Sequence, residues 1–291
     1  MRGREAIRNA PPHLYFVVSA VFHYLGPAFA VLLFARVDVL GVAWLRIASA
    51  ALIFALWRRP WRAFARLDAD GKRLLLTWGV VLAFMNSCFY ISIDRLPLGT
   101  VAAIEFLPVI ALAALGTRTL RNALALMLAV PGVYLLTDVQ LAGEPVGVAF
   151  AFANAILFAL YIVLAHRVSR YEQLEGIDGL AASMLIAAVV VTPLGGWDVA
   201  PALTDPIAIL AGIGVGVSSS VIPYISDQLA MRRLARATYA LMVSLLPATA
   251  TVIGIVVLAQ VPSWVEVAGV ALVIGGVAIH REQAGPDAEA V

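Results

Sequence analysis

Long apolar runs alternate with short polar connections along the chain. A helix needs about 20 residues to cross a hydrocarbon core of about 30 Å. Each of the longest apolar runs is near this length, and most of the charged residues lie between them. The pattern predicts ten membrane-spanning helices, near residues 13–34, 39–57, 74–93, 96–116, 120–138, 146–166, 179–196, 206–226, 237–259 and 264–280.

The composition supports this assignment. The chain is 62% hydrophobic and 13% charged, whereas a soluble domain averages about 25% charged residues. So little polar surface excludes a water-soluble fold of this size. A transmembrane β-barrel would show alternating segments of about ten residues rather than continuous apolar runs. The predicted class is an all-α polytopic membrane protein.

The basic residues predict the orientation of the helices. If the N-terminus is cytoplasmic, 17 of the 20 Lys and Arg residues fall in cytoplasmic segments, while Arg36 and Arg95 lie outside and Arg46 lies within a crossing. Lys and Arg in short loops favour the cytoplasmic side. An even number of crossings then places both termini in the cytoplasm.

The two halves of the chain resemble each other. GTVAAIEFLPVIALAALG (99–116) matches ATYALMVSLLPATATVIG (237–254), with a polar residue three positions before a proline in both. LAVPGVYLL and LVIGGVAIH match in the same order, as do FYIS and PYIS. Five crossings per half is an odd number, so the second copy enters the membrane in the opposite sense. We therefore expect inverted five-helix repeats over 13–139 and 146–280, related by an axis in the membrane plane, as in many secondary transporters.

Two segments carry a resemblance to a known family. NSCFYISIDRLPLGTVAAIEFLPVIALAALGTR (86–118) resembles the first-half core of EamA-type proteins of the drug/metabolite transporter superfamily. VAWLRIASAALIFALWRRPWR (42–62) resembles the second helix of the bacterial threonine/homoserine exporters within that superfamily. The resemblance extends over about residues 13–280. It implies ten helices, cytoplasmic termini and export of small molecules.

The resemblance therefore implies a secondary transporter in the bacterial cytoplasmic (inner) membrane that exports small amino acids by alternating access. A broader drug or metabolite exporter and a non-transporting membrane subunit are the alternatives. The expected partners are a small-molecule substrate and membrane lipid, with no nucleic acid, metal or cofactor. The chain has no P-loop, H-E-x-x-H or G-x-S-x-G motif, so ATP-driven transport and common hydrolytic chemistries are not expected.

Glu105 is the first candidate for a substrate site. A carboxylate at the bilayer centre costs about 2.5–3.5 kcal/mol on insertion scales, and such residues usually face a cavity or a partner. Glu105 could bind a substrate ammonium group or exchange a proton. The other interpretation is a structural ion pair with Arg46, which we expect at a similar depth.

Two prolines indicate local breaks in the helices. Pro108 and Pro247 each lack an N–H group, which would free the carbonyl group four residues earlier. In a membrane such carbonyl groups need another donor. Both prolines are expected to be structural or gating positions, and a packing kink is an equally good explanation of each.

Polar residues on other helices complete the predicted site. Asn86 and Tyr90 are four residues apart and therefore share a helix face, as do Ser220 and Tyr224. These side chains could hydrogen-bond the carboxylate and ammonium groups of an amino acid, or could instead join neighbouring helices. The remaining candidates are Ser244, His23 and Tyr161.

Overall fold

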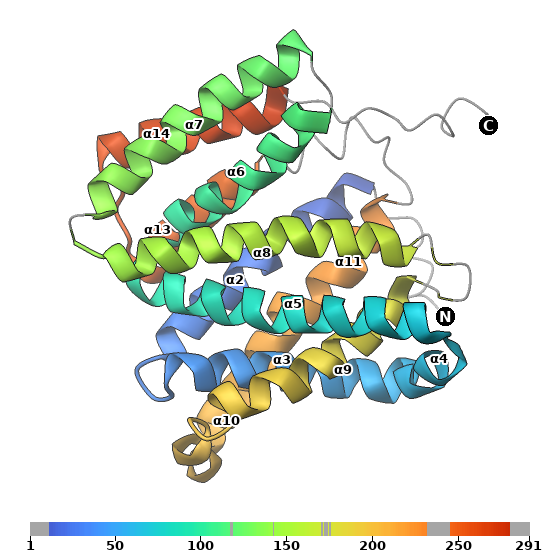
Figure 1. The fold of residues 1–291 in the computed structure, drawn as a ribbon. Coiled ribbons are helices and arrows are strands. Elements are labelled where there is room, and N and C mark those ends of the chain that lie inside the picture. The colour runs from blue at the N-terminus through green and yellow to red at the C-terminus, as the bar shows by residue number, and fades with distance from the viewer. Residues whose placement is uncertain are drawn as a thin grey trace.

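The computed structural model describes residues 12–116, 119–141, 143–169, 171, 174, 176–231 and 245–279. These residues are almost entirely helical (Figure 1). The helices of the first half are α2 (Pro12–Leu33), α3 (Val39–Arg58), α4 (Pro60–Arg66), α5 (Ala69–Arg95), α6 (Leu98–Gly116) and α7 (Leu120–Leu141). Those of the second half are α8 (Pro145–Ser169), α9 (Gly176–Gly195), α10 (Pro206–Gly216), α11 (Ile222–Met231), α13 (Leu246–Leu258) and α14 (Trp264–Ile279).

Most predicted helices agree with the structure to within a few residues. Six helices of the described chain are long and apolar enough to cross a membrane, and four shorter apolar helices accompany them. The prediction of an all-α polytopic membrane protein is confirmed, while the number of crossings stays a prediction. The connection predicted at 58–73 contains the short helix α4, and a 3₁₀ turn occupies Ala200–Thr204.

One predicted helix differs from the regular form. Residues 206–226 were expected to form a single α-helix, but a π-helical turn at Val217–Val221 separates α10 from α11. Pro223 lies two residues after the end of this turn. A proline cannot donate the hydrogen bond that a continuous α-helix requires, and π-bulges are frequent at functional sites.

Local sequence signals begin several helices. Asp68 begins α5 by accepting a hydrogen bond from the N–H of Gly71 at 2.8 Å. Hydrogen bonds from the Tyr171 hydroxyl and from Gly71 hold the pKa of this carboxyl below its usual value. Ser263 and Glu266 form a reciprocal capping box at the start of α14, with the Ser263 N–H 2.7 Å from a Glu266 oxygen. These caps satisfy N–H groups that the helices leave unpaired.

Helices that are distant in sequence pack in pairs. In Figure 1, α7 lies along α14 and α6 lies close to α13, while α8 runs beside α5 and α3 beside α9. α2 packs against α11 and α13. The α7–α14 contact needs small residues, because a Cβ atom on Gly132 would lie 2.8 Å from the carbonyl oxygen of Gly269. The two halves of the chain thus share one bundle.

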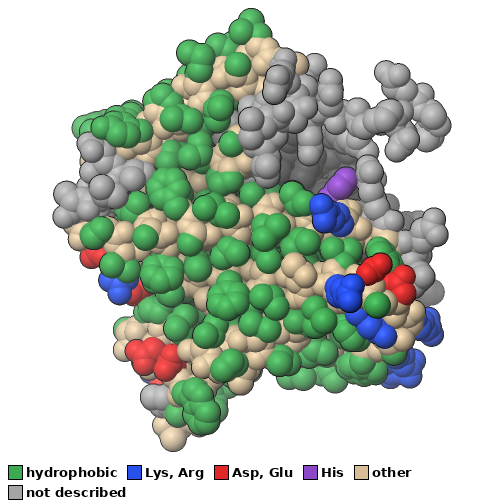
Figure 2. Space-filling model, in the orientation of Figure 1, with side chains coloured by type: hydrophobic (Ala, Val, Ile, Leu, Met, Phe, Trp, Pro, Cys, Tyr) green, Lys and Arg blue, Asp and Glu red, His purple; other side chains and the backbone are tan. Residues whose placement is uncertain are grey.

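The outer surface is suited to lipid. Apolar side chains cover the middle of the visible face, and charged side chains gather near its two ends (Figure 2). Leu56, Met127 and Val256 are 72%, 69% and 76% exposed. Such a continuous apolar band would be costly in water, and it is the expected surface of a protein that spans a bilayer.

An ion pair joins a loop of the first half to the start of α10. Arg36 contacts Asp205 at 2.9 Å, and Asp205 also caps α10 by accepting hydrogen bonds from the N–H groups of Ile207 and Ala208. The Arg36 guanidinium, more than the backbone groups, holds the pKa of Asp205 below its usual value. The stabilising effect of the charge is therefore present above the ordinary carboxyl pKa and is lost as pH falls through the lowered one.

Two substitutions separate the cap from the charge. We expect Asp205→Asn, which keeps a capping oxygen, to lower the thermal unfolding midpoint in detergent less than Asp205→Ala does. The difference between wild type and Asp205→Asn should disappear in strong acid. Asp94→Asn, a change at an exposed aspartate of α5, is the control. Equal midpoints for wild type and Asp205→Asn at neutral pH would show that the ion pair contributes nothing.

Candidate functional site

A cluster of polar side chains is buried where the two halves meet. Its members come from α3, α5, α6, α8 and the π-helical turn, and each is at most 8% exposed. We call this set the central cluster: Arg46, Tyr90, Glu105, Asn154, Ser219 and Ser220. Polar groups in a membrane interior must find partners inside the protein, so the contacts of each member indicate its role.

Arg46 on α3 binds the π-helical turn of the second half. Its Nε donates to the hydroxyl of Ser220 at 3.2 Å, and its Nη2 donates to the carbonyl oxygen of Ser219 at 3.3 Å. Ser219 lies four residues before Pro223, which has no N–H group to offer this carbonyl. The irregular backbone therefore supplies an acceptor for a buried guanidinium, and the guanidinium supplies a missing donor.

Tyr90 on α5 forms a second contact of this guanidinium. The Arg46 Cζ atom lies 5.4 Å from the centre of the Tyr90 ring, within the range of a cation–π interaction. The Tyr90 side chain is fully buried. Its hydroxyl lies near Ser219 and Arg46 but forms no hydrogen bond of regular geometry with a described residue. The cluster thus contains a polar group that the described protein leaves unsatisfied.

Glu105 on α6 is the acidic member of the central cluster. It is 7% exposed, lies beside Asn154 of α8 and is within electrostatic range of Arg46. In the described part of the chain, however, Glu105 and Arg46 form no direct ion pair. The structural ion pair considered as an alternative for Glu105 is therefore not present in this conformation. A guanidinium and a carboxyl group are therefore both buried here within electrostatic range but without direct contact.

Two aromatic residues of α2 lie close to these charges. His23 is within electrostatic range of Arg46, and Tyr24 is within range of Glu105. The two rings pack edge to face with their centres 5.3 Å apart. His23, predicted as a minor candidate, thus lies near the central cluster.

Three predicted site residues have other surroundings. Asn86 is buried on α5 and donates to the carbonyl oxygen of Leu82 on its own helix at 2.8 Å. Tyr161 on α8 lies in an aromatic group, with ring centres 5.5 Å from Trp78 and 6.4 Å from Phe158. Tyr224 is half-buried on α11 and packs against the apolar cluster that lies among α3, α5, α8 and α9.

The two prolines have different settings. Pro108 lies inside α6 and is half-buried, as expected. Pro247 is buried in the first turn of α13, where a proline costs no helical hydrogen bond. Residue 243, whose carbonyl group Pro247 was expected to free, lies outside the described residues, so that expectation stays a prediction. Ser244 lies outside the described residues.

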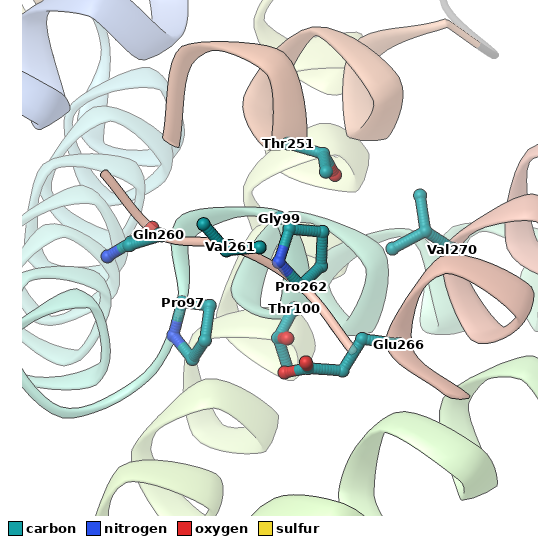
Figure 3. A pocket seen from close by; sticks show the side chains of 9 residues that line it. All are labelled: Pro97, Gly99, Thr100, Thr251, Gln260, Val261, Pro262, Glu266 and Val270. Carbon is teal, nitrogen blue, oxygen red and sulfur yellow. The ribbon is translucent and has the colours of Figure 1, made fainter. Parts of the chain in front are cut away.

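A separate pocket lies where α6 begins and α13 ends (Figure 3). It has a volume of about 220 Å³ and contains Thr100, Thr251, Gln260 and Glu266 among its lining residues. Figure 3 shows the Glu266 carboxylate directed toward Thr100. The Glu266 side chain also caps α14, which gives this buried acid a structural role.

The same end of the bundle is closed by a contact between the halves. The N–H of Leu98 donates to the side-chain oxygen of Gln260 at 3.1 Å. A Cβ atom on Gly99 would lie 2.3 Å from the Thr251 hydroxyl oxygen. The absence of a side chain at Gly99 therefore lets α6 approach α13 closely, and Gln260 caps the first turn of α6.

Comparisons with known proteins identify the family. The sequence model of the EamA-like transporter family matches residues 145–280. The threonine/homoserine exporter RhtA of Escherichia coli (strain K12) is 31% identical over 264 residues, which cover 88% of this chain and 87% of that protein. The chain belongs to the EamA-like transporter family. It is a multi-pass membrane transporter, and the resemblance noted in the sequence is confirmed.

Other similar proteins agree with this assignment. The threonine/homoserine exporter RhtA of Salmonella typhimurium (strain LT2) is 29% identical over 266 residues, covering 90% of this chain and 88% of that protein. A solved crystal structure has a TM-score of 0.60 at 19% identity and covers 91% of this chain and 96% of its own. The latter similarity shows the fold alone.

Two members of the central cluster of this EamA-like transporter were not predicted. Asn154 is a polar residue within the apolar run of α8, so the argument applied to Glu105 would have found it. Ser219 contributes through its backbone carbonyl, and its role depends on the π-helical turn. A periodicity argument assumes a regular helix and does not reveal that turn.

The Arg46 contacts give a test of the site. We expect Ser220→Ala to lower the free energy of unfolding by about 1.5–3 kcal/mol, the usual range for a hydrogen bond to a charged group. Ser218→Ala is the matched control, because the Ser218 hydroxyl donates to Gly214 and Val215 of its own helix. Thermal unfolding of both variants in detergent provides the comparison. If Ser220→Ala and Ser218→Ala lower the free energy of unfolding equally, the Arg46–Ser220 hydrogen bond contributes no more to stability than a local one.

Proposed function

We propose that this transporter exports small amino acids, with threonine and homoserine as the model substrates. The observation that supports this proposal most strongly is that Arg46 and Glu105 are both buried near each other without forming an ion pair. A zwitterionic amino acid has an ammonium group for Glu105 and a carboxylate for Arg46. Because Arg carries a planar set of donors suited to carboxylates, the substrate would complete the charge balance that the protein alone leaves open.

The relatives support the substrate class. The curated proteins from Escherichia coli and Salmonella typhimurium are named threonine/homoserine exporters. Alignment over most of both chains supports a similar cargo here. On the same grounds we place the chain in the cytoplasmic (inner) membrane of a bacterium, with both termini in the cytoplasm as the basic residues predict.

The packing pattern supports two five-helix repeats of opposite orientation. In the proposed repeats, α2, α3, α5, α6 and α7 correspond in order to α8, α9, the α10–α11 segment, α13 and α14. Exchanging each helix with its counterpart converts the α5–α8 contact into α2–α11, the α6–α8 contact into α2–α13, and the α5–α9 contact into α3–α10. The pairs α3–α9, α6–α13 and α7–α14 map onto themselves. A two-fold relation of this kind suits transport, in which one repeat rocks against the other.

The closed end of the bundle suggests the direction of access. With the basic residues in the cytoplasm, as predicted, the junction of Gln260 with Leu98 would lie at the outer face. We propose that this contact closes the outer side in the described conformation. Export then requires it to open after substrate has reached the central cluster from the cytoplasm.

The charge on Glu105 provides the test of this function. We expect Glu105→Gln to leave the protein folded and to reduce threonine transport in proteoliposomes at least about 30-fold, since losing one partner of a buried charge contact costs about 2 kcal/mol or more. Glu144→Gln, a change at a partly exposed acid that pairs with Arg95 at 3.7 Å, is the control.

Two outcomes would contradict the proposal. Normal transport by a folded Glu105→Gln would remove Glu105 from the site. If instead the double variant Arg46→Leu with Glu105→Leu recovers both folding and transport, the two charges serve only to balance each other. Transport of amines or dyes without transport of amino acids would favour the broader exporter.

A further inference from the structure

We propose that Asn154 forms a subsite for a hydroxyl group on the substrate side chain. The inference rests on the proposed function. Asn154 lies on α8 and is 1% exposed. Its amide lies against the Glu105 carboxyl, but neither its nitrogen nor its oxygen forms a hydrogen bond of regular geometry with a described residue. Buried polar groups are nearly always paired, and an amide has two groups to satisfy.

Other buried polar side chains in the bundle differ from Asn154. Asn86 donates to Leu82, Ser92 donates to Phe89, and Ser183 donates to Leu180, all on their own helices. These residues are explained by the fold alone. The fold does not explain Asn154 in this way, although a residue in a helix can donate a hydrogen bond to a backbone carbonyl of its own helix. Its unsatisfied amide therefore points to a partner that binds during function.

The position of Asn154 suggests what this partner is. The amide lies beside Glu105, which would hold the ammonium group of the substrate. The side-chain hydroxyl lies two bonds from the carbon that carries the ammonium group in threonine, and three bonds from it in homoserine. A group on that side chain would therefore lie within reach of Asn154.

The chemistry of the amide favours a hydroxyl. The Asn154 nitrogen donates hydrogen bonds and its oxygen accepts them, so the residue complements a group that both accepts and donates. Threonine and homoserine carry such a group, whereas valine has nearly the shape of threonine and lacks it. A site built to bind a hydroxyl disfavours the analogue without one, because its own polar groups then stay unpaired.

The described conformation is closed around this amide. Both amide atoms are shielded from solvent, so a substrate reaches Asn154 only when neighbouring helices separate. Alternating access provides this opening. Asn154 is thus expected to be unpaired in the empty closed state and paired when the site is loaded.

Transport selectivity tests the subsite. Proteoliposomes containing the full chain are loaded with threonine and valine, and their initial rates are compared. We expect wild type to prefer threonine at least tenfold, and Asn154→Leu to reduce this preference to about one. Asn122→Leu is the matched control, because Asn122 is equally buried at the start of α7, and it should keep the wild-type preference.

A stability measurement distinguishes recognition from a structural role. If Asn154 has no partner in the empty protein, Asn154→Leu should unfold at the same temperature as wild type or a higher one. The increase in unfolding temperature caused by threonine should fall in this variant to the increase caused by valine at the same concentration. Asn154→Asp provides a second variant of the same shape that keeps an acceptor and lacks the amide donor, and it should also lose threonine preference.

The outcomes separate this inference from the proposed function. Equal transport of threonine and valine by wild type, or an unchanged preference in a folded Asn154→Leu, would overturn the hydroxyl subsite while leaving amino acid transport intact. A strongly destabilised Asn154→Leu would assign Asn154 a structural role. Failure of wild type to transport either amino acid would instead overturn the proposed function.

Discussion

A guanidinium and a carboxylate share the apolar interior of this transporter without direct contact, and the arrangement of the surrounding helices depends on that fact. Charges in such surroundings are costly unless neighbouring groups compensate them. Arg46 is compensated by the Ser219 carbonyl, the Ser220 hydroxyl and the face of Tyr90. Glu105 has Asn154 and Tyr24 nearby. Each of the two side chains therefore has its own polar surroundings.

The compensation of Arg46 also links the halves mechanically. Arg46 lies on α3, and its acceptors lie on the π-helical turn between α10 and α11. In a regular α-helix the Ser219 carbonyl would accept a hydrogen bond from the N–H of residue 223. Pro223 has no N–H, so this carbonyl can accept a hydrogen bond from Arg46 instead. Rocking of one half against the other would change these contacts. The irregular turn is thus a point at which the Arg46 side chain joins the two halves.

Hydropathy predicted the helices well because each apolar run has the length that a bilayer requires. It predicted Glu105 and Arg46 because charges stand out against such runs. It did not reveal that they are separated, since this depends on the packing of α3 against α10 and of α6 against α8. The two prolines show a second limit: a proline has the same local chemistry in the first turn of a helix (Pro247) as in the middle of one (Pro108), and only the helix boundary decides its effect.

Equilibrium binding of substrate analogues tests the separated charges most directly, because it leaves the protein unchanged. Purified transporter is titrated with threonine, with threonine methyl ester, which lacks the carboxylate, and with the corresponding 2-hydroxy acid, which lacks the ammonium group. The account predicts that both analogues bind at least about 30-fold more weakly than threonine, since each leaves one buried charge without its partner. Binding of either analogue with the affinity of threonine would contradict the account.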